Sequence, residues 1–168
     1  MQLLTIDKAR YRQHLNRITV ASIAVLTVLS LAISSVLIIL LSDGQGSNFY
    51  LNLTGVVIAA VITVLILKKL KTHPYFNEVA YIWDLKHELN LIQRKIRRID
   101  AAAAQNNPDA LLILAFSYAG SALIWQLDNN TLMMSELNIA RNKLQQQIEA
   151  AHLQLDVNNY SRNLLNQF

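Results

Sequence analysis

Two long apolar stretches near the start of the chain limit what it can fold into more than any other feature. Residues 18–41 and 51–67 contain no charged side chain, and the segment between them is short and polar. A helix needs about 20 apolar residues to cross a bilayer. In lipid only a helix or a closed barrel satisfies its own backbone groups, and neither stretch alternates as barrel strands do. The sequence predicts a transmembrane hairpin with spans 18–41 and 51–67 and an outer turn 42–50.

Positive charges flank this hairpin on one side only. The turn has no Lys or Arg and one acid, Asp43. The positive-inside rule therefore places both termini in the cytoplasm of a multi-pass inner-membrane protein. Residues 1–17 form a basic cytoplasmic segment, either a short amphipathic helix on the inner leaflet or a solvated tail. The candidate contacts with anionic lipid around the hairpin are Arg10, Arg12, Arg17, Lys68, Lys69 and Lys71.

Small residues inside the spans predict how the two helices pack. Ser30 and Ser34 form one pair spaced by four residues, and Gly55 and Ala59 form another. Such pairs let helix backbones approach closely in lipid. We expect Gly55 and Ala59 to face the first helix. Neither span carries an ionisable side chain, which disfavours a transporter acting alone.

Residues 68–168 are predicted to form a cytoplasmic α-helical domain, and its clearest element is a long helix that begins near Pro74. Apolar residues spaced alternately by four and three give this helix the seam of a coiled coil or long bundle helix. Because no partner for it is evident in the sequence, we expect it to form an interface, including one between copies of the chain. The seam residues are Tyr75, Val79, Ile82, Leu85, Leu89, Ile92, Ile96 and Ile99.

A second helix, residues 110–127, is also apolar and leaves two alternatives. It holds few strongly apolar residues, has several polar ones, and lacks a flanking basic cluster, so a buried helix of the domain is favoured over a third span. Asn107 and Pro108 suit its N-cap and first position. Ser135 suits the N-cap of a further helix, and residues 161–168 suit a short terminal one. No strand pattern occurs, so the fold class is all-α.

Composition and motifs give little support to an enzyme or to nucleic-acid binding. Residues 1–73 carry a balance of +5 and residues 74–168 a balance of −1, so the basic character belongs to the membrane flanks. The chain has no cysteine, no phosphate-binding loop and no protease motif. Asp84, His87 and Glu88 share a helix face, but no second cluster completes a metal site. We expect no catalytic residue, cofactor, metal or nucleic acid.

The densest basic patch lies within the long helix. Arg94, Lys95, Arg97 and Arg98 could contact anionic lipid headgroups or RNA, or form a solvated face. In a straight helix Arg94 lies about 40 Å from residue 67. The patch reaches the membrane only if the chain bends at Pro74.

Three stretches resemble a known bacterial family. They are residues 6–17 (IDKARYRQHLNR), residues 107–116 (NPDALLILAF) and residues 127–132 (LDNNTL). They are similar to the family catalogued as domain of unknown function 3087. The resemblance implies a bacterial inner-membrane protein with two spans and a helical cytoplasmic tail, and it implies no activity.

These features lead to two functional hypotheses. The first is an inner-membrane-anchored helical scaffold that binds protein partners, including a second copy of itself. The second is a small accessory or regulatory subunit of a membrane transporter or envelope complex that acts through its spans. A pore built by oligomerisation is the least favoured reading, because the spans lack polar chemistry.

Overall fold

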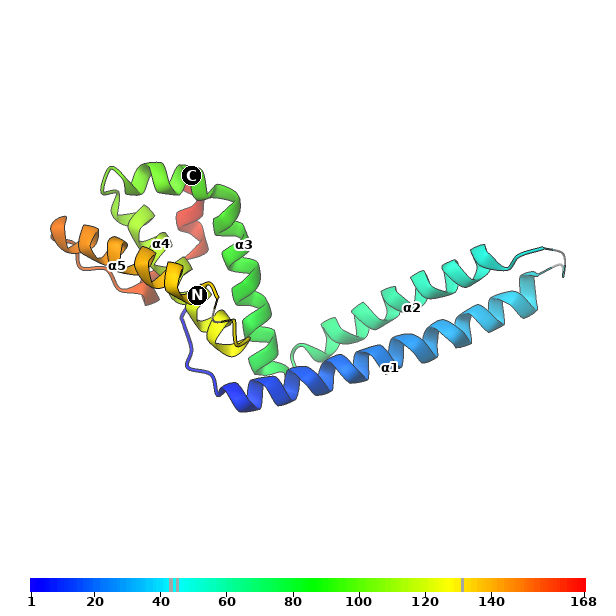
Figure 1. Ribbon diagram of the computed structural model, residues 1–168. Helices are drawn as coiled ribbons and strands as arrows, with labels where there is room; N and C mark the ends of the chain where they lie inside the picture. Colours follow the sequence, from blue (N-terminus) through cyan, green and yellow to red (C-terminus); the bar gives the residue numbers. More distant parts are fainter. Residues whose placement is uncertain (43, 45, 131) are drawn as a thin grey trace. The chain divides into compact units, whose positions relative to one another are not determined.

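The computed structural model describes residues 1–42, 44, 46–130 and 132–168 (Figure 1). Of the described residues 80% are helical and none lies in a strand, so the predicted all-α class is confirmed. Asp43 of the expected outer turn and Thr131 of the turn after residue 127 lie outside the described residues. The chain divides into two compact units, Ala9–Ala80 and a second formed by Met1–Lys8 with Tyr81–Phe168. Each unit is described by itself.

The unit Ala9–Ala80 is built on an antiparallel pair of long helices. Helix α1 spans Lys8–Leu41 and helix α2 spans Phe49–Leu70. Residues 8–17 are neither a separate surface helix nor a tail, because they continue the first apolar helix toward the N-terminus. This continuity has a local cause. No Gly or Pro interrupts residues 8–41, and Lys, Arg, Gln and Leu favour a helix.

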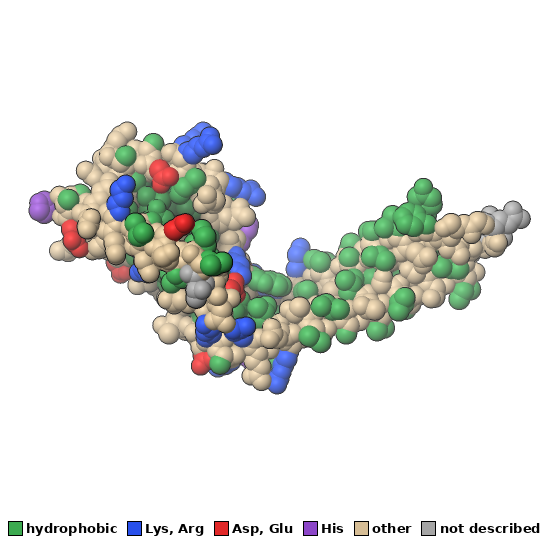
Figure 2. All heavy atoms as spheres, viewed as in Figure 1, with side chains coloured by type: hydrophobic (Ala, Val, Ile, Leu, Met, Phe, Trp, Pro, Cys, Tyr) green, Lys and Arg blue, Asp and Glu red, His purple; other side chains and the backbone are tan. Residues whose placement is uncertain are grey.

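Most of the large side chains on these two helices are exposed. In their most apolar windows, 6% of residues in α1 and 17% in α2 are buried within the protein. On the face that Figure 2 shows, hydrophobic side chains cover both helices, and Lys and Arg lie near one end of the pair. At about 1.5 Å per residue, α2 is roughly 33 Å long, which is close to the thickness of a hydrocarbon core.

A short 3-10 helix leads from α2 into the long helix α3. Helix η1 spans Pro74–Phe76 and α3 spans Asn77–Ala103. The His73 Nδ1 atom accepts a hydrogen bond from the Tyr75 backbone N–H at 3.2 Å and so caps η1. The sequence break expected at Pro74 is therefore a capped turn. Helix α3 ends where Asn106 adopts a φ of 59°, a left-handed conformation that asparagine tolerates.

The helical domain, Met1–Lys8 with Tyr81–Phe168, continues with α4 (Pro108–Leu127), α5 (Met134–Ala150) and the short 3-10 helices η2 (Val157–Asn159) and η3 (Arg162–Gln167). The predicted N-cap of α4 is confirmed, because the Asn107 side chain accepts a hydrogen bond from the Ala110 backbone N–H at 3.0 Å. The predicted cap of α5 is wrong. Helix α5 begins at Met134, so Ser135 already lies inside its first turn.

Helix α4 lies at the centre of the helical domain and contacts α5, η2 and η3. In its most apolar window 56% of the residues are buried within the protein, far more than in α1 or α2. Helix α3 packs against it where Gly120 leaves room. A Cβ atom on Gly120 would lie 3.2 Å from a methyl carbon of Leu85 and 3.2 Å from one of Leu89. The buried residues of α4 are Ala110, Leu111, Leu112, Ile113, Leu114, Phe116, Gly120, Ala122, Ile124 and Leu127.

Candidate functional site

The two long apolar helices touch most closely at the small residues that the sequence singles out. A Cβ atom built on Gly55 would lie 2.2 Å from the Ser34 Oγ atom and 2.8 Å from the Ser34 backbone nitrogen. The Ser34 hydroxyl donates a hydrogen bond to the Asn52 carbonyl at 3.3 Å. Ala59 is 0% exposed and Ser30 is half-buried. Gly55 therefore sets the distance between α1 and α2, because any side chain there meets the backbone of α1.

Toward the other end of the pair, where the basic residues lie, a crevice opens between α1 and α2. Its volume is about 290 Å³. Ile18, Ala21 and Val25 line it from α1, and Ile66 and Leu70 line it from α2. Tyr75 and Phe76 of η1 complete the lining, and the charged side chain in it is that of Arg17.

The Tyr75 side chain of this crevice is held by a small polar cluster. The imidazole of His14 packs against the Tyr75 ring, with centroids 4.0 Å apart and the two ring planes tilted by 31°. The Glu78 carboxylate lies 3.0 Å from the Arg10 Nε atom and 3.4 Å from the His14 Nδ1 atom. These contacts join the first turns of α1 to η1 and the start of α3. The position of the Tyr75 ring therefore depends on side chains from both ends of the unit's sequence.

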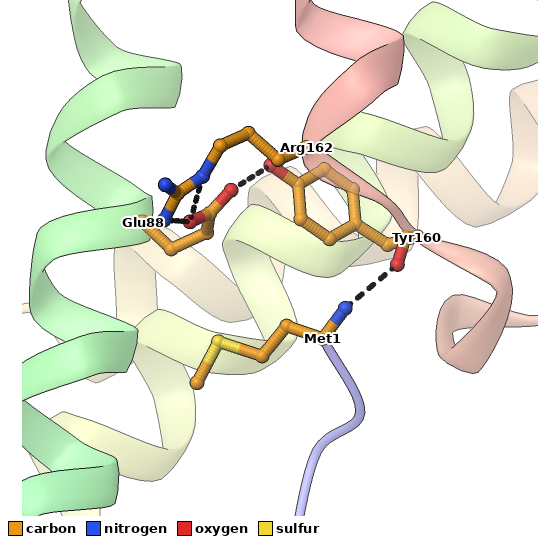
Figure 3. Close-up of polar contacts among 4 residues, drawn as sticks. All are labelled: Met1, Glu88, Tyr160 and Arg162. Carbon is orange, nitrogen blue, oxygen red and sulfur yellow. Dashed lines mark hydrogen bonds and ion pairs between the residues drawn. The ribbon is translucent and has the colours of Figure 1, made fainter.

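A second polar cluster lies in the helical domain around Glu88, a carboxylate that is only 3% exposed (Figure 3). The Tyr160 hydroxyl donates a hydrogen bond to Glu88 Oε1 at 2.7 Å, and the Arg162 Nε atom donates one to Oε2 at 2.9 Å. The Tyr160 ring stacks on Phe116 with centroids 3.9 Å apart. The Met1 amino group donates to the Tyr160 carbonyl at 2.9 Å. The cluster thus fastens the C-terminal segment to α3 and α4.

The ionisation of this cluster follows from its contacts. Burial alone raises the pKa of Glu88, but hydrogen bonds from Arg162 and Tyr160 and the charge of Arg162 outweigh burial and hold it below the ordinary 4.5. Burial and the hydrogen bond to Glu88 raise the pKa of the Tyr160 hydroxyl well above its ordinary 10.0. Near neutral pH the pair is a carboxylate that accepts from a protonated phenol.

The seam of α3 has partners within the chain. Ile82, Leu85, Ile92 and Ile99 are fully buried, and Val79 is nearly so. Tyr75, Leu89 and Ile96 are half-buried. Leu85 and Leu89 meet α4 at Gly120. The expectation of an interface between copies rested on a seam with no partner evident in the sequence. Partners for part of the seam come from the same chain, from α4 for Leu85 and Leu89 and from His14 of α1 for Tyr75. An interface between copies through the seam stays a prediction.

Half of the basic patch on α3 also serves the C-terminal segment. The Lys95 Nζ atom donates to the Leu165 carbonyl at 2.6 Å, and an Arg98 guanidinium nitrogen donates to the Phe168 carbonyl at 2.7 Å. The Arg94 Nε atom donates to the Asn90 side chain at 3.2 Å. Arg94 and Arg97 are exposed. Lys95 and Arg98 therefore help to hold helix η3, a role that the clustering of charge did not indicate.

The face that carries Asp84, His87 and Glu88 gathers no metal-ligand set, and among the described residues no group of three or more His, Cys, Asp or Glu side chains is placed to hold a metal ion. Glu88 instead pairs with residues more than 70 positions away. Sequence reasoning missed Tyr160, Arg162 and Phe116. The one signal was a carboxylate directly beside the apolar seam, next to Leu89, since a buried charge needs a partner.

The sequence of the chain matches one known family. A family model described as "Protein of unknown function (DUF3087)" matches residues 1–165. The chain belongs to the DUF3087 family. The family suspected from residues 6–17, 107–116 and 127–132 is thereby confirmed. No curated protein and no solved structure matches this DUF3087 chain. The Glu88 cluster and the α1–α2 crevice both lie within the matched residues.

Proposed function

We propose that this protein is a two-span anchor in the bacterial inner membrane that carries a helical scaffold domain in the cytoplasm. The observation that supports this most is a contrast in burial. In the part of the chain that the structure describes, three helices are long and apolar enough to cross a membrane, but α4 buries 56% of its apolar window inside the protein, against 6% for α1 and 17% for α2. Exposed apolar surface of that extent on α1 and α2 needs a nonaqueous environment.

The proposed orientation rests on charge. Lys8, Arg10, Arg12 and Arg17 lie in the first turns of α1, and Lys68 and Lys69 lie in the last turn of α2. Both sets mark the same end of the antiparallel pair, and the positive-inside rule assigns that end to the cytoplasm. The domain formed with Tyr81–Phe168 is then cytoplasmic.

The scaffold role rests on the surface that the domain leaves open. Because most of the seam is buried, a partner, including a second copy, would bind elsewhere. Leu132 and Met133, just before α5, and Ile139, in α5, are exposed, and so is Trp83 of α3. Exposed large apolar and aromatic side chains of this kind are enriched in protein interfaces. Light scattering on the purified full chain, with Ile139→Ser as the variant, tests self-association through α5.

The absence of cysteine makes the orientation directly testable. Single cysteines are introduced at Ser47 in the connecting segment and at Gln145 on α5, two exposed positions. In intact bacterial spheroplasts, a membrane-impermeant maleimide should label Ser47→Cys. Labelling of Gln145→Cys should require lysis. The opposite pattern would place the helical domain outside. Labelling of both positions in intact spheroplasts would exclude a structure in which α1 and α2 each cross the membrane.

A role through the spans remains the second candidate, and the structure changes where to look for it. Gly55 and Ala59 pack inside the helix pair, so they are not free for an outside partner. Val57, Val61 and Leu65 instead form one exposed ridge on α2, spaced by four residues. If replacing this ridge abolishes co-purification of partners while Ile139→Ser leaves it intact, the spans rather than the domain make the contact.

A further inference from the structure

We propose that the crevice between α1 and α2 is a binding site for one anionic phospholipid, with an acyl chain between the helices and the phosphate at Arg17. This inference rests on the proposed insertion of both helices. Among the lining residues, Arg17 is the sole charged one, and it lies one position before the apolar part of α1. Basic pockets between transmembrane helices on the cytoplasmic side suit anionic headgroups.

The walls of the crevice favour hydrocarbon over water. They consist almost wholly of apolar atoms, and the hydroxyls of Ser22 and Thr63 are already satisfied. Ser22 donates to the Ile18 carbonyl at 2.7 Å, and Thr63 donates to the Ala59 carbonyl at 2.8 Å. A ligand inside therefore finds no free donor in these side chains. An acyl chain needs none, and it gains contact with the side chains on both walls.

The shape and charge of the crevice favour a lipid chain over a protein helix. Its volume is about 290 Å³. A helix with its side chains is about 10 Å wide, whereas a hydrocarbon chain is much narrower and can lie between the two walls. A neighbouring span, such as α1 or α2 of a second copy, would also bring no anion to Arg17, because neither helix contains Asp or Glu.

The mouth of the crevice carries the charge that selects the headgroup. Among the described residues Arg17 makes no hydrogen bond or ion pair, so its guanidinium is free to hold a phosphate. Lys68 and Lys69, both exposed, directly follow the lining residue Leu67. With both helices inserted, the Tyr75 ring, packed against His14, would suit the headgroup layer, where amphipathic rings are enriched. A zwitterionic lipid would place its cationic headgroup beside these basic residues, where like charges repel.

The test uses the full chain in nanodiscs of mixed phosphatidylglycerol and phosphatidylcholine, followed by native mass spectrometry of the released protein. Wild type should retain one phosphatidylglycerol per chain in preference to phosphatidylcholine. Arg17→Gln should lower that retention about fivefold, the factor that corresponds to about 1 kcal/mol for one cation at the membrane surface. Arg12→Gln is the matched control, because it removes the same charge from an exposed position outside the crevice.

A second pair of variants tests the acyl-chain part. Ala21→Phe fills the crevice, whereas Ala24→Phe adds the same ring to an exposed position of α1 that does not line it. The first should lose the retained lipid and the second should keep it. Inorganic phosphate at millimolar concentration should not displace the lipid, because it has no chain. Displacement by phosphate would mean that the site recognises the anion alone and would overturn the proposal.

A measurement on the wild-type chain tests the site even if a variant fails to fold. Phosphatidylglycerol with a photoreactive acyl chain should crosslink to Ile66 and Leu67 of the crevice more than to Val57 and Leu65, which are at least as exposed. Equal labelling of the two sets, or equal retention in Arg17→Gln and Arg12→Gln, would overturn the lipid site. Cysteine labelling of the same variants in intact spheroplasts separates this failure from a failure of insertion itself.

Discussion

Replacing Glu88 with methionine should destabilise the helical domain by about 2 kcal/mol. The side chain is 3% exposed, and methionine keeps its length while removing the carboxylate. The Tyr160 hydroxyl then loses its acceptor in a buried site, which costs about 1–3 kcal/mol. The lost pair with Arg162 adds little, because Arg162 is 61% exposed and solvated.

The assay can follow this domain within the intact protein. Both tryptophans, Trp83 and Trp125, lie in Tyr81–Phe168, and the long apolar helices α1 and α2 contain none. Intrinsic fluorescence of the full chain in nanodiscs therefore reports unfolding of the helical domain. For a domain of this size, a change of 1 kcal/mol in the free energy of unfolding shifts the thermal unfolding midpoint by about 4–8 °C. Glu88→Met should therefore lower that midpoint by roughly 8–16 °C. Glu149→Met, at an exposed position of α5, is the control and should shift it little.

A double variant tests directly whether the unpaired Tyr160 hydroxyl causes the loss of stability. Tyr160→Phe keeps the stack on Phe116 and removes the hydroxyl, so in Glu88→Met/Tyr160→Phe no buried donor lacks a partner. This double variant should be more stable than Glu88→Met alone. If the two effects simply add, or if Glu88→Met behaves like Glu149→Met, the buried hydrogen bond does not hold the C-terminal segment and the reasoning is refuted.

Three further outcomes are expected. The folded-state pKa of Glu88 lies below the ordinary 4.5, so the stabilisation that the Glu88 carboxylate gives is complete above pH 4.5 and is lost as the pH falls through the folded-state pKa. When the full chain is acidified and its tryptophan fluorescence followed, wild type should lose stability more steeply than Glu88→Met. Gly55→Ala should push α1 and α2 apart, since its Cβ would lie 2.8 Å from a backbone nitrogen, and spin labels at Val28 and Leu65 should report a longer, broader distance distribution than in wild type. Gly120→Val should cost about 1–3 kcal/mol by overpacking against Leu85 and Leu89, measured as a lower urea midpoint; an unchanged midpoint would show that the leucines yield freely.

The sequence by itself determined the helices and the family. Uninterrupted apolar runs and the break at Pro74 are local signals, and so is the cap at Asn107, because a helix is stabilised by residues within one or two turns. Even there the start of α1 was missed, since the basic residues 8–17 differ in polarity from the apolar run and still favour a helix. The motif stretches that suggested the family lie within the residues it matches.

Only the tertiary structure decided what the helices do with their side chains. Glu88 and its partners Tyr160 and Arg162 are more than 70 residues apart, and no periodicity links positions at such separation. The crevice likewise depends on tertiary packing, because its walls come from α1, α2 and η1, and the spacing of residues within one helix does not show how far apart two helices lie. The seam of α3 shows the same limit. Its spacing predicts that the seam residues are buried, but the hydrophobic effect is non-directional, so the spacing does not identify the helix that covers them.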